Sequence, residues 1–331
     1  MDTTLSKCNR LDIESLGWWA VGVVITQTAL FEGLQTPIVM LSKLLSSLKV
    51  LRGSAAGHSY GVCEMQGHRH YMEDTHIVSE LSASQALVGI FDGHGGDAVS
   101  HFMRDHATRI FTETKEFKEG RYTDALARTF LNADAELRRK KDLRNQCGST
   151  ATLLFFNGDT LHVGNVGDSR AAVCHKARGV HLTVDHKPTD PAERERIEAA
   201  GAFVCEYSCR INRLHYNLSR AVGDFYYKAD DDLEPGRQVM SIVADTKEYQ
   251  LTKDDKYIIV ASDGLWDFRD TQELVQAASR YLAETKDLGS ACAELCKYVV
   301  NKPGDPHFKE LPAAAGKDNI TTILVNCSLQ L

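Results

Sequence analysis

The feature that most constrains the fold of this chain is a series of short apolar runs, rich in β-branched residues, that begins near Ser59. Runs of this length and composition are typical of β-strands. In chain order they are YGVCEM, ALVGIF, TATLLFF, TLHVGNV, AAVCH, YIIVAS and ITTILV. They come in groups with helical segments interspersed, but strand and helix do not alternate regularly. This pattern favours an α+β layered sandwich over a doubly wound parallel sheet.

Three helices are predicted from periodicity and from end signals. Thr123–Lys141 carries apolar residues at helical spacing. A second helix opens with the sequence DPAE, in which Asp190 is the cap, proline follows it and glutamate completes a capping box. This helix is predicted to end at Gly201. A third helix is predicted to open at Asp270 and to run to about Ala283.

The first 56 residues differ from the rest and are expected to form an apolar extension before a catalytic domain at 57–331. Seventeen uncharged residues lie between Glu14 and Glu32, and a mostly apolar stretch follows them. This length is at the lower edge of a membrane span, so packed helices and membrane association through residues 16–51 both remain open. The acidic residues near the start argue against a signal peptide. We expect a cytoplasmic location, with membrane association or mitochondrial import through the extension as alternatives.

The charge balance limits the partners of the chain. It has 38 basic and 45 acidic residues, a net charge of −7, and a pI of about 6.0. Because nucleic-acid binding usually needs a strongly basic face, we expect no nucleic-acid partner. The nine cysteines are odd in number and scattered, which favours buried thiols in a reducing compartment over a zinc site or disulfides.

Several acidic residues share one kind of position, at the end of an apolar strand and beside glycine or another small residue. They are Asp92, Asp168, Asp263, Asp318 and the pair Glu73 and Asp74. Taken singly, each aspartate is well explained as a turn former or a helix cap. Five such sites favour convergence on one pocket, where carboxylates repel one another unless a cation is bound. A donor set made only of oxygen points to Mg²⁺ or Mn²⁺ rather than zinc.

Nine motifs stand in the same order as in the metal-dependent protein serine/threonine phosphatases. They are GHRHYMED, FDGHGGDAVSHF, CGSTATLLF, VGNVGDSRAAV, LTVDHKP, EAAGAFV, LSRAVGD, VASDGLWD and KDNITTILV. Over about residues 57–328 the chain therefore resembles this family. Single motifs of this kind are weak, but nine in order are specific. The first 56 residues have no counterpart in the resemblance.

The resemblance implies a fold and a binuclear metal centre. The fold would be a four-layer α-β-β-α sandwich, in which helices flank two central antiparallel sheets. Two Mg²⁺ or Mn²⁺ ions would be bound by Asp74, Asp92, the carbonyl oxygen of Gly93, Asp263 and Asp318. A weaker third ion would be bound by Asp168 and Asp267, with Asp263 shared between this site and the main pair. A helical turn after Asp263 would place Asp263 and Asp267 on one face.

The resemblance also implies roles for three residues around the metal ligands. Arg69 stands where the family clamps the substrate phosphate, and a guanidinium suits this task because its fork matches phosphate oxygens. Glu73 matches an acid that holds metal-bound water. His94 matches the proposed general acid for the leaving alkoxide. The alternatives are an Arg69–Glu73 ion pair and a histidine that only stabilises a turn.

The implied activity is hydrolysis of phosphoserine and phosphothreonine in proteins by direct attack of a hydroxide that bridges the two ions. Phosphorylated proteins are then the expected partners of a monomeric catalytic domain. Two alternatives remain: a catalytically inactive binding or regulatory module, and a small-molecule phosphomonoesterase on the same core. All expected carboxylates are present, which favours activity. A cysteine nucleophile of the tyrosine-phosphatase type is not expected.

Overall fold

The computed structural model describes residues 48–140, 147–205, 210–211, 216–300 and 317–327, with only the backbone described at 210–211. The chain divides into two compact units, residues 1–46 and residues 47–331. The predicted apolar extension lies almost entirely outside the described residues, so its membrane association stays a prediction. In the described part of the chain, no helix has both the length and the apolar character that crossing a bilayer requires.

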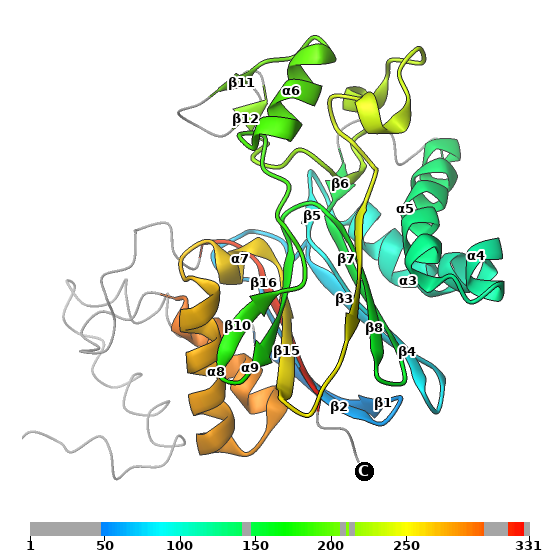
Figure 1. The fold of residues 1–331 in the computed structure, drawn as a ribbon. Coiled ribbons are helices and arrows are strands. Elements are labelled where there is room, and N and C mark those ends of the chain that lie inside the picture. Colours follow the sequence, from blue (N-terminus) through cyan, green and yellow to red (C-terminus); the bar gives the residue numbers. More distant parts are fainter. Residues whose placement is uncertain (1–47, 141–146, 206–209, 212–215, 301–316, 328–331) are drawn as a thin grey trace, which may run out of the picture. The chain divides into compact units, whose positions relative to one another are not determined.

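Two antiparallel sheets lie at the centre of the unit 47–331 (Figure 1). The strands of the six-stranded sheet lie in the order β1 (Lys49–Ala55), β2 (His58–Met65), β16 (Ile320–Asn326), β15 (Asp255–Ala261), β9 (Arg170–His175) and β10 (Arg178–His181). Those of the five-stranded sheet lie in the order β14 (Asp245–Gln250), β8 (Thr160–Val166), β7 (Ala151–Asn157), β4 (Gln85–Phe91) and β3 (Thr75–Ser82). All the strands predicted from apolar runs are among them.

Helices cover one face of each sheet. The six-stranded sheet is covered by α8 (Thr271–Thr285) and α9 (Leu288–Tyr298). The five-stranded sheet is covered by α3 (Ala98–Glu113) and α5 (Tyr122–Arg139), with the short α4 (Lys115–Lys118) between them. Figure 1 shows these helices on opposite sides of the paired sheets. The predicted α-β-β-α sandwich is therefore confirmed.

The core explains why the central strands are apolar along their whole length. In β4, Val88 and Ile90 belong to the apolar layer between the two sheets. Leu87 and Phe91, from the same strand, pack with α3 and α5. Successive side chains of a strand point to opposite faces, so a strand buried on both faces reads as one continuous apolar run.

A small sheet lies beside the strand ends that carry the acidic residues. It consists of β13 (Val222–Gly223), β6 (Gly148–Ser149) and β5 (Gly93–His94). Beside it lie α6 (Pro191–Ala199), the hairpin of β11 (Val204–Cys205) and β12 (Arg210–Ile211), and the 3-10 turns η3 (Phe225–Lys228) and η4 (Pro235–Arg237). A separate apolar cluster holds this part together: Ile197, Val204, Leu218, Ala221, Tyr227 and Met240.

Two sequence-based predictions differ from the structure. The helix α6 begins after Asp190 as predicted, but the predicted capping box is wrong because the Glu193 carboxylate accepts hydrogen bonds from Arg196, Ser219 and Arg220. The predicted boundary after residue 56 also differs, since residues 49–55 are strand β1, paired along its length with β2. The sheet thus includes the last residues assigned to the extension.

Candidate active site

Antiparallel pairing brings the acidic strand ends together. Asp74 precedes β3 and Asp92 follows β4, and these strands pair with Thr75 opposite Phe91. In the other sheet, Asp263 follows β15 and Asp318 precedes β16, whose pairing reaches Ala261 opposite Thr322. The end of one strand therefore lies beside the start of its neighbour in both sheets. Each sheet contributes two of the four predicted carboxylate ligands.

The carboxylates are close enough to repel one another. Asp74 is 3% exposed, and burial raises its pKa to about 7, against hydrogen bonds that lower it and with Asp318 adding repulsion. Burial also raises the pKa of Asp92 well above its usual value, followed by the charges of Asp74, Asp263, Asp318 and Asp168. The pKa of Asp263 is raised in the same way. Acidic groups from both sheets thus share one site.

The donor chemistry of this site fits a divalent cation. The Oδ1 atoms of Asp74 and Asp168 are buried and have no hydrogen-bond partner. Such an oxygen is costly to bury unless a cation or donor meets it. Nevertheless, the described residues include no group of three or more His, Cys, Asp or Glu side chains arranged closely enough to hold one ion. The features that suit a divalent cation are therefore the oxygen donors and the two buried oxygens without a hydrogen-bond partner.

Gly93 is packed too tightly to carry a side chain. A Cβ atom there would lie 2.5 Å from the Glu73 carbonyl oxygen and 2.8 Å from Ser100 Oγ. The Ser100 hydroxyl donates to that same carbonyl at 2.6 Å. The backbone of residues 73 and 93 is thus held together beside Asp92.

Arg69 pairs with a predicted metal ligand rather than with Glu73. Its Nη2 lies 2.7 Å from Asp318 Oδ2, and both side chains remain partly exposed. Burial lowers the pKa of Arg69, but the hydrogen bond and charge of Asp318, with those of Asp263 and Asp92, raise it overall. The guanidinium is therefore charged and faces the carboxylate cluster.

Asn319 holds the loop that carries Arg69. Its Oδ1 accepts the backbone N–H of Glu73 at 2.7 Å, and its Nδ2 donates to the carbonyl oxygens of Gln66 and Tyr71 at 2.8 and 3.0 Å. The side chain is 4% exposed. One amide thus fastens residues 66–73 to the start of β16.

The two acids of the predicted third metal site have different surroundings. Asp168 is 1% exposed, and its Oδ2 accepts a hydrogen bond from Lys187 Nζ at 2.5 Å. Asp267 is exposed and ends the helical turn α7 (Asp263–Trp266), with its N–H donating to the Asp263 carbonyl oxygen at 2.9 Å. The predicted helical turn after Asp263 is therefore present. Lys187 occupies Oδ2 of Asp168 and leaves Oδ1 without a hydrogen-bond partner, and its positive charge would weaken the binding of a cation there.

His94 does not simply stabilise a turn through the backbone. Its Nε2 lies 2.6 Å from Asp224 Oδ2, and the Asp224 side chain is fully buried. Burial lowers the pKa of His94, but the Asp224 carboxylate outweighs it, with smaller contributions from Asp168 and Glu73, and the pKa is raised overall. Glu73 is thus close enough to His94 for its negative charge to help raise the pKa of the ring.

Sequence reasoning missed four polar residues of the site: Ser262, which donates to Asp74 Oδ2 at 2.8 Å, and Lys187, Asp224 and Asn319. All four stand inside the motifs quoted above. Ser262, Asp224 and Asn319 are nearly or fully buried. Their polar type beside apolar strands was the available signal, because a buried polar group needs a partner.

Two of the thiols that the structure describes, Cys63 and Cys147, have surroundings that do not favour a nucleophile. Cys63 does stand six residues before Arg69, the spacing C-x5-R, but it is fully buried in β2. Contact with Cys296 and burial raise its pKa far above the usual value. Burial also raises the pKa of Cys147, whose thiol donates to the carbonyl oxygen of Gly95, the residue after His94. Because the thiolate is the reactive form, these surroundings disfavour cysteine catalysis.

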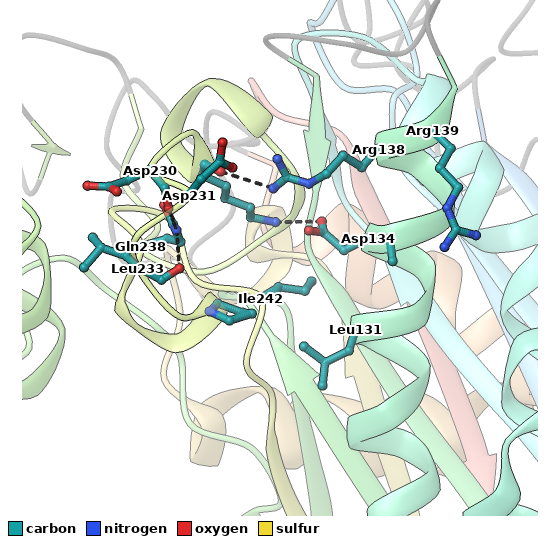
Figure 2. A pocket seen from close by; sticks show the side chains of 12 residues that line it. Leu131, Asp134, Arg138, Arg139, Asp230, Asp231, Leu233, Gln238 and Ile242 are labelled. Carbon is teal, nitrogen blue, oxygen red and sulfur yellow. Dashed lines mark hydrogen bonds and ion pairs between the residues drawn. The ribbon is translucent and has the colours of Figure 1, made fainter.

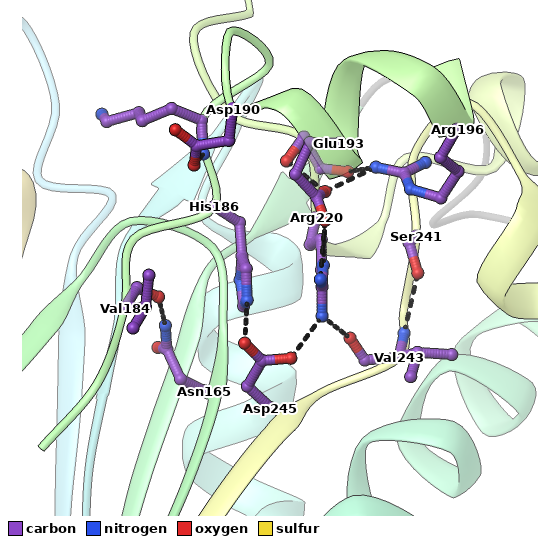
Figure 3. Close-up of polar contacts among 12 residues, drawn as sticks. Asn165, Val184, His186, Asp190, Glu193, Arg196, Arg220, Ser241, Val243 and Asp245 are labelled. Carbon is purple, nitrogen blue, oxygen red and sulfur yellow. Dashed lines mark hydrogen bonds and ion pairs between the residues drawn. The ribbon is translucent and has the colours of Figure 1, made fainter. Parts of the chain in front are cut away.

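An ionic cluster supports the loop before Asp168 (Figure 3). Arg220 joins Glu193 of α6 to Asp245 of β14, at 2.6 and 2.8 Å. Asp245 Oδ2 lies 3.2 Å from His186 Nε2. The other ring nitrogen, His186 Nδ1, accepts the N–H of Gly167 at 3.0 Å. Arg220 is therefore structural, and its cluster reaches the residue next to Asp168.

Comparison with known proteins decides the family. The sequence model described as "Protein phosphatase 2C" matches residues 58–303. The chain belongs to the protein phosphatase 2C family. The Paramecium tetraurelia protein "Probable protein phosphatase 2C 3" is 35% identical over 279 residues, covering 80% of this chain and 91% of the relative. The Schizosaccharomyces pombe "Protein phosphatase 2C homolog 2" is 33% identical over 275 residues, covering 80% and 72%.

Solved structures agree with the fold of a protein phosphatase 2C. The crystal structure of serine-threonine phosphatase 2C from Toxoplasma gondii superposes with a TM-score of 0.69 at 21% identity, covering 84% of this chain and 99% of that one. At this identity the likeness speaks for the fold alone. The family and its relatives establish the present chain as a protein serine/threonine phosphatase, a hydrolase that acts on phosphorylated proteins.

Proposed function

We propose that this protein phosphatase 2C hydrolyses phosphoserine and phosphothreonine in a reaction that depends on two Mg²⁺ or Mn²⁺ ions, with a weaker third ion at Asp168 and Asp267. The observation that carries the proposal is the convergence of carboxylates from both sheets, of which two keep a buried oxygen without a partner. Asp74, Asp92, the Gly93 carbonyl oxygen, Asp263 and Asp318 would hold the two main ions. When bound, such a pair of ions would lower the pKa of a water molecule and so supply the hydroxide nucleophile.

The side chains around this centre would divide the remaining work. Arg69 would bind the phosphate oxygens and neutralise the charge that builds up on them, moving from Asp318 to the substrate. Glu73 would hold a water through its carboxylate. His94 would give a proton to the leaving oxygen of the serine or threonine. Phosphate monoesters hydrolyse so slowly alone that the whole site has to lower the barrier by on the order of 20 kcal/mol or more.

The test is to assay the purified full chain on a phosphothreonine peptide and on small phosphate esters, with Mn²⁺, with Mg²⁺ and with EDTA. We expect peptide hydrolysis with either metal and none with EDTA. Turnover that persists in EDTA would contradict the metal requirement. No turnover with metal would favour the inactive module, and a much higher kcat/KM for metabolic esters than for peptides would favour a small-molecule phosphatase. Calorimetric titration with Mn²⁺ measures binding independently of activity.

Cellular location and oligomeric state also remain proposals. We propose a cytoplasmic, monomeric enzyme, with the part of the apolar residues 16–51 that precedes β1 as the segment that would attach it to a membrane or direct it to mitochondria instead. Fractionation of cells that express the tagged full chain, beside a tagged chain of residues 47–331, tests this. A membrane or mitochondrial fraction that requires residues 1–46 would overturn the cytoplasmic proposal.

A further inference from the structure

The small sheet brings two side chains together that are 130 residues apart in sequence. Its central strand β6 pairs with β5 on one side and with β13 on the other. In this register Gly148 lies opposite both His94 and Gly223. Asp224 follows β13 directly, so its carboxylate and the His94 ring reach the same place beside Gly148.

The contact between His94 and Asp224 is short and enclosed. His94 Nε2 lies 2.6 Å from Asp224 Oδ2, and the edge of the Tyr216 ring packs on the imidazole with 5.1 Å between centroids. A Cβ atom on Gly148 would overlap both Asp224 Oδ2 and His94 Nε2. The pair therefore occupies space that only a glycine at 148 leaves free.

The backbone at Asp224 is held in an unfavourable conformation. Its φ of +51° and ψ of 42° are left-handed, a conformation that is unfavourable for a residue with a side chain. Such a conformation persists only where the surroundings hold it. Here Asp224 N–H donates to the Cys147 carbonyl oxygen at 3.0 Å, and Gly223 N–H donates to Asp134 Oδ1 at 2.8 Å.

A buried ion pair completes the support from behind. Lys228 Nζ lies 2.7 Å from Asp134 Oδ1, and both side chains are almost fully buried. Figure 2 shows this contact at a pocket beside α5, where Arg138 also donates to the Lys228 carbonyl oxygen at 3.2 Å. The segment 222–228 is thus held against α5 by the contacts of Gly223 and Lys228 with Asp134.

We propose that Asp224 is a positioning residue that fixes the orientation of the His94 imidazole for proton donation. By accepting the Nε2–H, Asp224 sets the ring plane and leaves Nδ1 as the nitrogen that faces the substrate. This inference rests on the proposed function, because it assumes that His94 donates a proton to the leaving oxygen. It adds a residue that does not touch the substrate and acts only through His94.

The step balances as an ordinary ester hydrolysis. The oxygen of a water forms the new bond to phosphorus while the bond from phosphorus to the serine or threonine oxygen breaks. The electron pair of the broken bond stays on the leaving oxygen, which takes the proton from His94. The proton released by the attacking water then returns to Nδ1 and restores the protonated ring of His94, and the products are the alcohol and inorganic phosphate.

The test compares substrates whose leaving groups differ. A phosphothreonine peptide has a poor leaving group that needs a proton, whereas p-nitrophenyl phosphate has a good one that does not. For Asp224→Asn and for His94→Ala we expect kcat/KM on the peptide to fall by on the order of 10²–10³ and on p-nitrophenyl phosphate by less than about fivefold. The double variant should behave like His94→Ala alone, because Asp224 acts only through that ring.

A second His–Asp pair in the chain provides a matched control. Asp255 is fully buried and its Oδ1 lies 2.9 Å from His175 Nδ1, at the end of β15 away from Asp263. Asp255→Asn should lower the unfolding midpoint. It should leave unchanged the ratio of kcat/KM on the peptide to kcat/KM on p-nitrophenyl phosphate. The ratio does not depend on the fraction of folded protein, so partly unfolded samples remain informative.

The outcomes test the positioning role of Asp224 separately from the proposed phosphatase reaction. If His94→Ala lowers the ratio and Asp224→Asn does not, the positioning role is wrong and the proposed function stands. If His94→Ala leaves the ratio unchanged, proton donation by His94 is wrong and the positioning role falls with it. If Asp224→Asn does not fold, Gly148→Ala decides, since its Cβ would separate the pair and should lower the ratio; an unchanged ratio there would overturn the proposal.

Discussion

At the scale of the residue, the two oxygens of three buried carboxylates in this enzyme have different surroundings. Asp74, Asp168 and Asp224 each have one oxygen bonded to a donor, which is respectively Ser262, Lys187 or His94, and one that is buried without a partner. The bonded oxygen fixes the orientation of the group, and the other stays available. A carboxylate oriented in this way loses little entropy when it meets a cation or a proton.

Asp263→Asn tests the metal site at one ligand. We expect kcat to fall by about 10³-fold, which corresponds to about 4 kcal/mol of lost transition-state stabilisation. Because the neighbouring carboxylates repel Asp263, removing its charge should not lower the unfolding midpoint in EDTA. The rise of that midpoint on adding Mn²⁺ should shrink. Retained activity together with an unchanged Mn²⁺ effect would argue against the assignment.

Arg69→Ala tests the phosphate clamp. We expect KM for the phosphopeptide to rise by about 10–100-fold with a smaller change in kcat, because a charged fork on phosphate contributes about 1.5–3 kcal/mol. Arg104→Ala is the matched control, since Arg104 is an exposed arginine paired with Asp105 outside the site. Steady-state kinetics of both variants measures the difference. An Arg69→Ala enzyme with the kcat/KM of the control would remove the proposed role.

At the scale of the element, periodicity and strand-end position predicted the central parts and missed the margins. β4 and β7 were predicted because both of their faces are buried and apolar. β14 was missed because it is an edge strand, exposed along nearly all of DTKEYQ. α9 was missed because its buried residues are mostly small (Gly289, Ala291, Cys292, Ala293 and Cys296, with Leu295), which suits a close approach to β2 but gives no row of large apolar residues in the sequence.

The same limits apply to the candidate site. The convergence of Asp74, Asp92, Asp263 and Asp318 could be predicted because each stands at the end of a recognisable strand. The position of Asp224 could not, since the strand before it has only two residues and its backbone is left-handed. The contact of Arg69 with Asp318 depends on a loop geometry that Asn319 sets through hydrogen bonds. Such contacts leave no period in the sequence.

Gly61→Ala tests the packing of α9 on the six-stranded sheet. A Cβ at position 61 would overlap the backbone of Leu288 and Gly289 at the start of α9. Backbone does not move aside as a side chain does, so we expect a loss of about 2–3 kcal/mol in the free energy of unfolding. At Gly236 the nearest contact is the tip of Val243 at 3.2 Å, so Gly236→Ala should cost much less. Equal costs in denaturant titrations would contradict this packing.

Glu193→Gln tests the ionic cluster that joins α6 to β14. Burial opposes ionisation, but Arg220, Ser219 and Arg196 lower the pKa of Glu193 from 4.5 to about 2. A folded-state pKa below the unfolded one gives stability that is complete above about pH 4.5 and is lost as the pH falls towards 2. We expect the variant to be less stable by about 2 kcal/mol at pH 7. The difference from the parent should vanish near pH 2, and a constant difference across this range would contradict the proposed ionisation.

At the scale of the whole molecule, the unit 47–331 is larger than the family resemblance indicates. The family match begins at residue 58, whereas β1 pairs with β2 from residue 49 to residue 55. Arg52 of β1 also lies 2.7 Å from Asp287, at the start of α9. The edge strand therefore joins both the sheet and its covering helix. It protects the edge of β2 from pairing with other chains.

Truncation tests this boundary. A chain that starts at residue 47 should keep the unfolding midpoint and the activity of the unit, because β1 is intact. A chain that starts at Gly57 should unfold at a lower temperature and aggregate more readily, because it exposes the edge of β2. Thermal unfolding and light scattering of both chains measure this. If the two chains behave alike, β1 does not contribute to the stable unit.

The place of β16 has a consequence for how the enzyme comes into being. This strand is nearly the last of the described residues, yet it lies in the middle of its sheet between β2 and β15, and Asp318 stands two residues before it. During synthesis on the ribosome, the sheet stays open until residue 326 has emerged, since distant pairing awaits its partner. Fragments left by a premature stop codon before Asp318 lack a central strand and a carboxylate at once. Such incomplete polypeptides are therefore expected to have no phosphatase activity.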